Sequence, residues 1–237
     1  MAKRSAKQLE LTFRCWGGAR KGAGRKPARR GQRRARHRRR PKLTRRNPVH
    51  VTLKVGRDIG NLRAKKRRQV IRRAFAEAGR CVDARIVDWS IQKNHLHLVV
   101  EADATRALSR LMQGFGIRVA KGLNRLLGRT GSVFVERYHA RVLQTPAEIR
   151  NARAYVLNNY RRHAATRGHV IVSGWVDPCS SWVWFDGWRD LDAEHRAIAR
   201  KARAGPPLAM PARGYLLRTG WRRRGLVRVD EVPGRRR

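Results

Sequence analysis

Alternation of apolar and polar residues predicts four β-strands in this chain. In the segment "PVHVTLKV" (48–55), every second residue from position 49 is Val or Leu, so an extended segment has one apolar face. The other three predicted strands are "ARIVDWSIQ" (84–92), "HLHLVVEA" (95–102) and "SVFVERYHARVL" (132–143). Only Lys93 and Asn94 separate the second strand from the third, a spacing typical of a β-hairpin.

Apolar residues at helical spacing predict three helices between and after these strands. Residues 58–79 and 104–127 each carry an apolar stripe, as a helix packed on a sheet requires. A third helix starts at "TPAE" (145–148), a capping box with proline at the first helical position, and is expected to run to about Arg162. The predicted order is β-α-β-β-α-β followed by an additional helix. This is an α+β, ferredoxin-like arrangement.

Charge divides the chain into three parts. Residues 1–46 contain 19 Lys and Arg but a single acid, Glu10, so we expect a disordered basic arm that cannot bury a core. Its "GRKP" (24–27) is similar to the basic core of AT-hook minor-groove binders, although a purely electrostatic arm is the favoured interpretation. Residues 47–163 form the predicted folded domain. Residues 164–237 form an aromatic and basic extension with a short helix expected at 189–203.

The composition favours nucleic acid as the partner. Lys and Arg number 58 against 16 Asp and Glu, a formal net charge of +42, which calls for a polyanionic ligand. No segment approaches the 18 apolar residues of a membrane span, and no apolar signal core is found near the N-terminus. Three widely spaced cysteines indicate neither a disulfide framework nor a zinc ribbon. We therefore expect a cytoplasmic, nucleoid-associated protein without a membrane partner.

Two histidines stand one residue apart in the third predicted strand, within "NHLHLVV" (94–100). Side chains two residues apart on a strand share a face, so His95 and His97 project together and can bind a divalent metal ion. The alternative is two ordinary polar residues on a solvated face. The sequence has Val99 where a histidine-triad hydrolase needs a third histidine, and it contains no HExxH and no phosphate-binding loop. A metal site therefore needs another ligand from elsewhere.

The third predicted helix carries two tyrosines on different faces. At 100° per residue, Tyr155 lies on the polar face among amides and an arginine, whereas Tyr160 lies in the apolar stripe and is expected in the core. A tyrosine hydroxyl can attack phosphorus and form a covalent phosphotyrosine. Asn159 lies one turn beyond Tyr155, where its amide oxygen can complete a metal site with His95 and His97.

Together these motifs resemble a known family. The strand "HLHL", the sequence Tyr-x-x-x-Asn on a helix 58 residues later, and "ERYHARVL" between them are similar to the HUH-type tyrosine transposases of IS200-like elements. The REP-associated tyrosine transposases are the most similar branch. The resemblance covers residues 47–163. It implies that His95 and His97 bind Mg²⁺ or Mn²⁺, that Tyr155 attacks a DNA phosphate, and that Asn159 takes the place of a third ligand, which is Gln in many relatives.

The resemblance also implies the reaction and its partners. Single-stranded DNA bearing hairpins would be cleaved and rejoined through a 5′-phosphotyrosine intermediate, without a nucleotide cofactor, by a monomer or homodimer. DNA phosphates are expected to contact basic side chains on the arm, the second helix and the tyrosine region. The residues predicted for this role are Arg25, Lys26, Arg110, Arg118, Lys121, Arg125, Arg137 and Arg162.

Other interpretations remain open at this point. One is a catalytically silent, domesticated transposase that acts as a sequence- or hairpin-specific DNA-binding protein. Another is a basic RNA-binding protein of ribosomal type, which leaves the histidine pair and Tyr155 unexplained. The aromatic residues of "WVDPCSSWVWFDGW" (175–188) can stack on exposed bases, although packing on their own domain is favoured. Tyr138 and His139 are further candidate DNA contacts.

Overall fold

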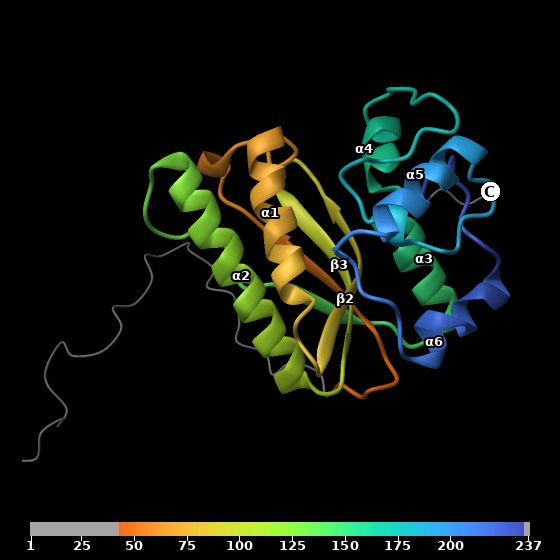
Figure 1. Cartoon of the computed structure of the whole chain (residues 1–237), viewed down its shortest axis with the longest axis horizontal. Helices are drawn as coiled ribbons and strands as arrows, with labels where there is room; N and C mark the ends of the chain where they lie inside the picture. The colour runs from red at the N-terminus through yellow and green to blue at the C-terminus, as the bar shows by residue number, and fades with distance from the viewer. Residues whose placement is uncertain (1–42, 235–237) are drawn as a thin grey trace, which may run out of the picture. The chain divides into compact units, whose positions relative to one another are not determined.

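The computed structural model describes residues 43–234 (Figure 1). The greater part of the predicted basic arm, including Arg25 and Lys26, lies outside the described residues. The described residues belong to one compact unit. None of their helices combines the length and the apolar character that crossing a bilayer requires.

A four-stranded antiparallel sheet lies at the centre of this unit, in the order β2-β3-β1-β4. The strands are β1 (Val49–Lys54), β2 (Ala84–Ile91), β3 (His95–Ala102) and β4 (His139–Val142). Helix α1 (Lys65–Ala78) follows β1, and helix α2 (Thr105–Leu127) follows β3. This strand order and connectivity confirm the predicted α+β, ferredoxin-like fold.

Helices α1 and α2 cover one face of the sheet (Figure 1). The alternation along β3 places Leu96, Leu98 and Val100 on this face, where all three are fully buried. Phe75 of α1 packs between Trp89 of β2, at 4.5 Å between ring centroids, and an α2 phenylalanine at 4.9 Å. The predicted apolar faces of strands and helices are therefore confirmed.

Helix α3 (Pro146–Leu157) covers the opposite face of the sheet. The predicted capping box is present, because the hydroxyl of Thr145 accepts a hydrogen bond from the amide of Glu148 and the Glu148 carboxylate accepts one from the amide of Thr145. Two apolar side chains of the sheet, Val87 and Val99, pack against this helix. The face that carries His95 and His97 is thus covered by protein.

The prediction of one continuous helix to Arg162 is wrong. Helix α3 ends at Leu157, Asn158 has φ −103° and ψ 17°, and helix α4 (Asn159–Thr166) begins at the next residue. The break changes the rotational phase of the residues that follow. Tyr160 consequently leaves the apolar stripe and is 37% exposed, so its predicted place in the core is also wrong.

Two other element boundaries differ from the predictions. The helix expected from residue 58 begins at Lys65, because Gly60 adopts a left-handed backbone (φ 74°) after the 3-10 turn Arg57–Ile59. The strand expected at 132–143 is limited to β4, which pairs Thr52 with His139. Pairing reappears only as an isolated bridge between Val55 and Phe134. That bridge is two residues out of register, so the ladder is interrupted.

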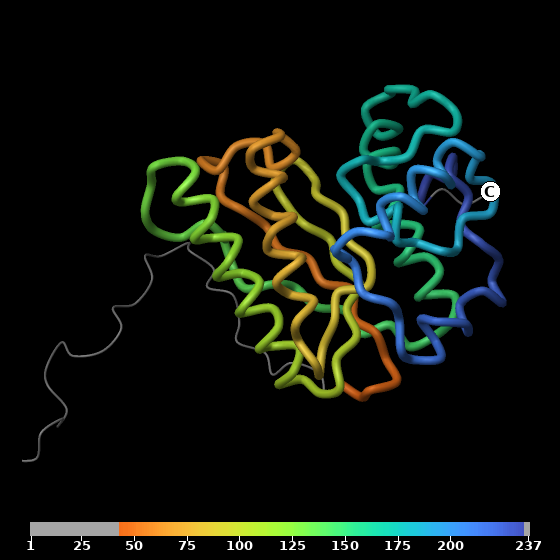
Figure 2. Tube along the Cα trace, in the orientation of Figure 1, coloured from red at the N-terminus to blue at the C-terminus, as the bar shows by residue number. Residues whose placement is uncertain are grey.

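One part of the extension packs against α3 (Figure 2), and another part, including Cys179 and Ala209, joins the core beneath α1 and α2. The elements of the extension are η2 (Trp182–Trp184), α5 (Ala193–Arg203), α6 (Tyr215–Arg218) and η3 (Gly220–Arg224), so the predicted short helix is confirmed within 189–203. Trp182 and Phe185 are buried, and Trp184 lies 6.1 Å from Trp89 between ring centroids. The favoured interpretation, in which the aromatic segment packs on its own domain, is confirmed.

Candidate active site

The two histidines of β3 lie side by side on the face covered by α3. The ring centroids of His95 and His97 are 4.6 Å apart, and the rings are nearly perpendicular. His97 is only 4% exposed, and His95 is partly buried. The alternative of two polar residues on a solvated face is therefore wrong for His97. His95 Nδ1 lies 2.8 Å from the side-chain oxygen of Asn94. Nε2 is therefore the nitrogen of His95 that remains for a metal ion.

Strand β1 supplies two neighbours of His97 that are not among the residues predicted for the site. The antiparallel register places Thr52 opposite His97. Both the hydroxyl of Thr52 and Nε2 of His50 lie 3.2 Å from Nδ1 of His97. The signal was present in "VHVT" (49–52), where His50 and Thr52 share one strand face, but only the pairing of β1 with β3 shows which residues this face meets.

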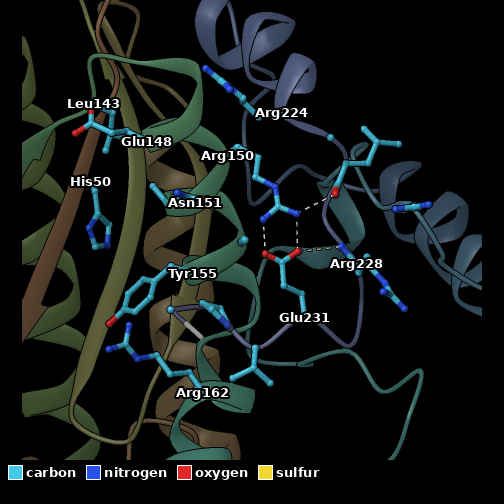
Figure 3. Close-up of a pocket in the computed structure, with 18 of the residues that line it drawn as sticks. His50, Leu143, Glu148, Arg150, Asn151, Tyr155, Arg162, Arg224, Arg228 and Glu231 are labelled. Carbon is cyan, nitrogen blue, oxygen red and sulfur yellow. Dashed lines mark hydrogen bonds and ion pairs between the residues drawn. The ribbon is translucent and has the colours of Figure 1, made fainter. Parts of the chain in front are cut away.

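Tyr155 on α3 points toward the free side of His97. Its hydroxyl oxygen lies 3.5 Å from Nε2 of His97, and the ring centroids are 5.0 Å apart. The guanidinium carbon of Arg162 lies 5.1 Å from the centroid of the Tyr155 ring. Figure 3 shows Tyr155 between His50 and Arg162. The structure thus brings four residues predicted for the site into one cluster: His95, His97, Tyr155 and Arg162.

Asn159 has an unusual environment for a polar residue. It is fully buried, and neither its amide nitrogen nor its amide oxygen has a hydrogen-bond partner within residues 43–234. Leaving a polar group buried and unpaired costs roughly 1–3 kcal/mol. Asn159 is the first residue of α4 and stands one helical turn before His163, whose ring lies 5.9 Å from that of His95. Because the amide oxygen of Asn159 has no hydrogen-bond partner among the described residues, its chemistry fits the role of a metal ligand.

A carboxylate-based metal centre is not found in the part of the chain that the structure describes. No group of three His, Cys, Asp or Glu side chains there is arranged to bind a metal ion. A divalent cation held by His95 and His97 would therefore need a ligand of another type, and the unpaired amide of Asn159 is suited to this role. The donor set of two imidazoles and one amide oxygen fits a divalent cation.

Burial keeps the site histidines neutral. It lowers the pKa of His97 to about 2, helped by the nearby charges of His95, His50, His163 and Arg162. Burial likewise lowers the pKa values of His50 and His95 to about 4. A metal ion binds the neutral imidazole, so the histidines are in the ligand form at neutral pH.

The predicted DNA-contacting residues are divided between two sides of the sheet. Arg110, Arg118, Lys121 and Arg125 are exposed on α2, which lies on the side opposite to α3 and Tyr155 (Figure 1). Arg110 is also paired with Asp83. Arg137 is exposed just before β4, next to the partly buried Tyr138 and the exposed His139. Of the described residues in this set, Arg162 is the one that contacts Tyr155.

This chain matches a known protein family over part of its length. Residues 49–159 match the protein family described as "Transposase IS200 like", a segment that contains both histidines of β3, Tyr155 and Asn159. A solved structure of a REP-associated tyrosine transposase bound to a REP hairpin is 17% identical to this chain. It matches with a TM-score of 0.48, over 76% of this chain and 93% of the other. No match was found among curated protein sequences.

Proposed function

We propose that this chain, whose residues 49–159 match the family of IS200-like transposases, cuts and rejoins single-stranded DNA with Tyr155 as the nucleophile. One observation carries the proposal. The hydroxyl of Tyr155 lies 3.5 Å from Nε2 of His97, although the two residues are 58 positions apart in the chain. A phenol held beside paired imidazoles and an arginine has the groups that phosphoryl transfer requires.

His95 and His97, with the amide oxygen of Asn159, are the residues that would hold Mg²⁺ or Mn²⁺. When bound, such a cation polarises the phosphodiester and neutralises the charge that develops during transfer. Contacts within the protein itself orient these candidate ligands. His97 is oriented by Thr52 and His50, and Asn159 is buried without a competing partner among the described residues.

The reaction exchanges one phosphodiester for another. The oxygen of Tyr155 forms a bond to phosphorus, and the bond from phosphorus to the 3′-oxygen breaks. The phenol gives up its proton and the released 3′-oxygen gains one, so no proton is consumed. The 5′-phosphate remains as an ester of Tyr155. A second 3′-hydroxyl can then attack this ester, which joins a new strand and restores the tyrosine.

Arg162 supplies positive charge next to the reacting oxygen. Its guanidinium faces the Tyr155 ring at 5.1 Å, and the side chain is exposed enough to reach a bound phosphate. We expect it to stabilise the phenolate and to position the scissile phosphate, because oriented donors act most strongly where charge develops.

The test is the capture of a covalent protein–DNA adduct. Hairpin-bearing single-stranded DNA is incubated with the protein and Mg²⁺ or Mn²⁺, and denaturing gels show whether a fraction of the protein migrates with DNA. Tyr155→Phe should abolish the adduct. Tyr160→Phe is the matched control, since it removes a hydroxyl from the neighbouring, more exposed tyrosine, and should leave it intact. An adduct that survives Tyr155→Phe would reject the assigned nucleophile. Tight DNA binding without any adduct would favour the catalytically silent alternative.

A further inference from the structure

A large cavity opens beside Tyr155, on the side away from the α1 and α2 layer (Figure 3). Its volume is about 1040 Å³, at the upper end of the roughly 300–1,000 Å³ of ordinary ligand sites. One wall is α3 with His50 and the end of β4. The other wall is the extension, through Arg189 and residues 224–234. We call this space the arginine cavity.

Positive charge dominates the arginine cavity. Six arginines and three carboxylates line it. Two of the arginines, Arg141 and Arg150, are paired with carboxylates of the cavity itself, and Arg228 is paired with Asp190. Within residues 43–234, the other three arginines have no carboxylate partner: Arg162, Arg189 and Arg224. Unpaired guanidiniums in a concave site favour a phosphate-bearing ligand.

Partly buried hydrogen bonds hold the wall formed by the extension against α3. Arg150 pairs with both carboxylate oxygens of Glu231, one at 2.6 Å, and donates to the carbonyl oxygen of Leu226 at 3.0 Å. The amide nitrogen of Asn158 donates to the carbonyl oxygens of Arg228 and Glu231, at 2.9 and 3.1 Å. The wall is therefore fixed before a ligand arrives, which reduces the entropic cost of binding.

From these observations we infer that the arginine cavity binds the DNA nucleotides on the 3′ side of the scissile phosphate, the part that stays attached to Tyr155. This inference rests on the proposed function. In a displacement at phosphorus, the attacking and leaving oxygens lie roughly in line on opposite sides. The strand that ends in the released 3′-hydroxyl therefore departs away from the Tyr155 oxygen. The strand that keeps its phosphate remains beside Tyr155, where the cavity opens.

The inference gives the extension a role in substrate binding. Arg189 and Arg224 lie outside the segment that matches the transposase family, residues 49–159, yet both line the same cavity as Tyr155. The affinity for the retained strand would then depend on residues of the extension as well as on those of the matched segment.

The experiment measures binding of mimics of the retained strand, separately from catalysis. Full-length protein carrying Tyr155→Phe is titrated with a pool of short single-stranded oligodeoxynucleotides of randomised sequence, followed by fluorescence anisotropy. One pool carries a 5′-phosphate, and the other carries a 3′-phosphate with the same total charge. The 5′-phosphorylated pool should bind more tightly, because its end matches the strand retained on Tyr155.

Arginine substitutions then locate the binding site. Arg189→Ala with Arg224→Ala should weaken binding of the 5′-phosphorylated pool about tenfold or more, since hydrogen bonds to charged groups are lost. It should also make the salt dependence of binding less steep. The matched control is Arg196→Ala with Arg200→Ala, which removes two exposed arginines from α5 and should change little.

The outcomes separate this inference from the proposed function. Equal affinity for the two pools, or equal losses in the cavity and control variants, would overturn the assignment of the cavity. The 5′-phosphorylated pool could instead bind preferentially through Arg189 and Arg224, while the protein with Tyr155 in place never forms the adduct. That result would reject only the proposed chemistry.

Discussion

Nε2 of His50 on β1 lies 3.2 Å from Nδ1 of His97 on β3, and the two rings stack with centroids 5.2 Å apart. Thr52 lies at the same distance from the same nitrogen. The contact leaves Nε2 of His97 facing Tyr155. Groups that hold the far nitrogen of a metal-binding histidine fix its tautomer and orientation. His50 is therefore a positioning residue for the candidate metal site.

Replacing His50 tests this role. His50→Phe keeps an aromatic ring against His97 but removes the hydrogen-bonding nitrogen. We expect Mn²⁺ affinity, measured by isothermal titration calorimetry, to fall about 10- to 100-fold. His169→Phe changes an exposed histidine outside the cluster and should bind Mn²⁺ like the unmodified protein. Identical affinities for the two variants would remove His50 from the site.

The same substitution at the adjacent residues Asn158 and Asn159 should change the free energy of unfolding in opposite directions. Asn159→Leu removes two buried, unpaired polar atoms, so the metal-free protein should gain about 1–3 kcal/mol of unfolding free energy. Asn158→Leu removes two hydrogen bonds to the extension and should lose stability by a similar amount. Urea unfolding measures both changes.

Metal binding separates the two asparagines further. Mn²⁺ should raise the melting temperature of the unmodified protein and of Asn158→Leu, because a ligand that binds only the folded state stabilises it. It should leave the melting temperature of Asn159→Leu almost unchanged. A full Mn²⁺-induced increase in Asn159→Leu would show that this amide is not a ligand.

A buried ion pair connects α3 to the sheet and the extension. Arg153 donates to Asp88 at 2.8 Å and to the carbonyl oxygen of Leu217 at 3.0 Å. Its guanidinium lies 4.5 Å from the ring centroid of Phe185 and 4.8 Å from that of Trp221. Arg153→Met should lower the free energy of unfolding by about 3–5 kcal/mol, because it leaves a buried carboxylate without its partner. Asp88→Asn combined with Arg153→Met should recover part of this loss in urea unfolding.

The stability of Arg153→Met should also depend on pH in a defined direction. Burial raises the pKa of Asp88, and the guanidinium of Arg153 opposes that shift. Without Arg153, the folded state binds the Asp88 proton more tightly than the unfolded chain, whose Asp pKa is about 3.9. The variant should therefore lose stability as pH rises above about 4 until Asp88 is ionised in the folded state. A destabilisation that is constant with pH would contradict this account.

Arg162 should contribute to catalysis more than to metal binding. Arg162→Ala removes the guanidinium that faces Tyr155, and we expect the rate of adduct formation to fall about 100-fold while Mn²⁺ affinity is retained. Arg162→Lys keeps the charge but not the planar donor geometry, so it should recover only part of the rate. A parallel loss of rate and of Mn²⁺ affinity in Arg162→Ala would indicate a structural role instead.

The sequence by itself determined the local features of the fold. Alternation predicted β3 with its observed bounds and placed Leu96 and His97 on opposite faces, because side-chain direction repeats every two residues along a strand. The Thr145–Glu148 capping box predicted the start of α3 for a similar reason, since its hydrogen bonds join residues three positions apart.

Tertiary structure alone decided which distant surfaces meet. The register of β1 against β3 brought His50 to His97, and the break at Asn158 turned Tyr160 out of the core. Hydrogen bonds from Asn158 to carbonyl oxygens at least 70 residues later fixed the wall of the arginine cavity. Periodicity records which way a side chain points relative to its neighbours in the chain. The partner across a sheet or cavity depends instead on how separate elements pack, and no local pattern encodes that choice.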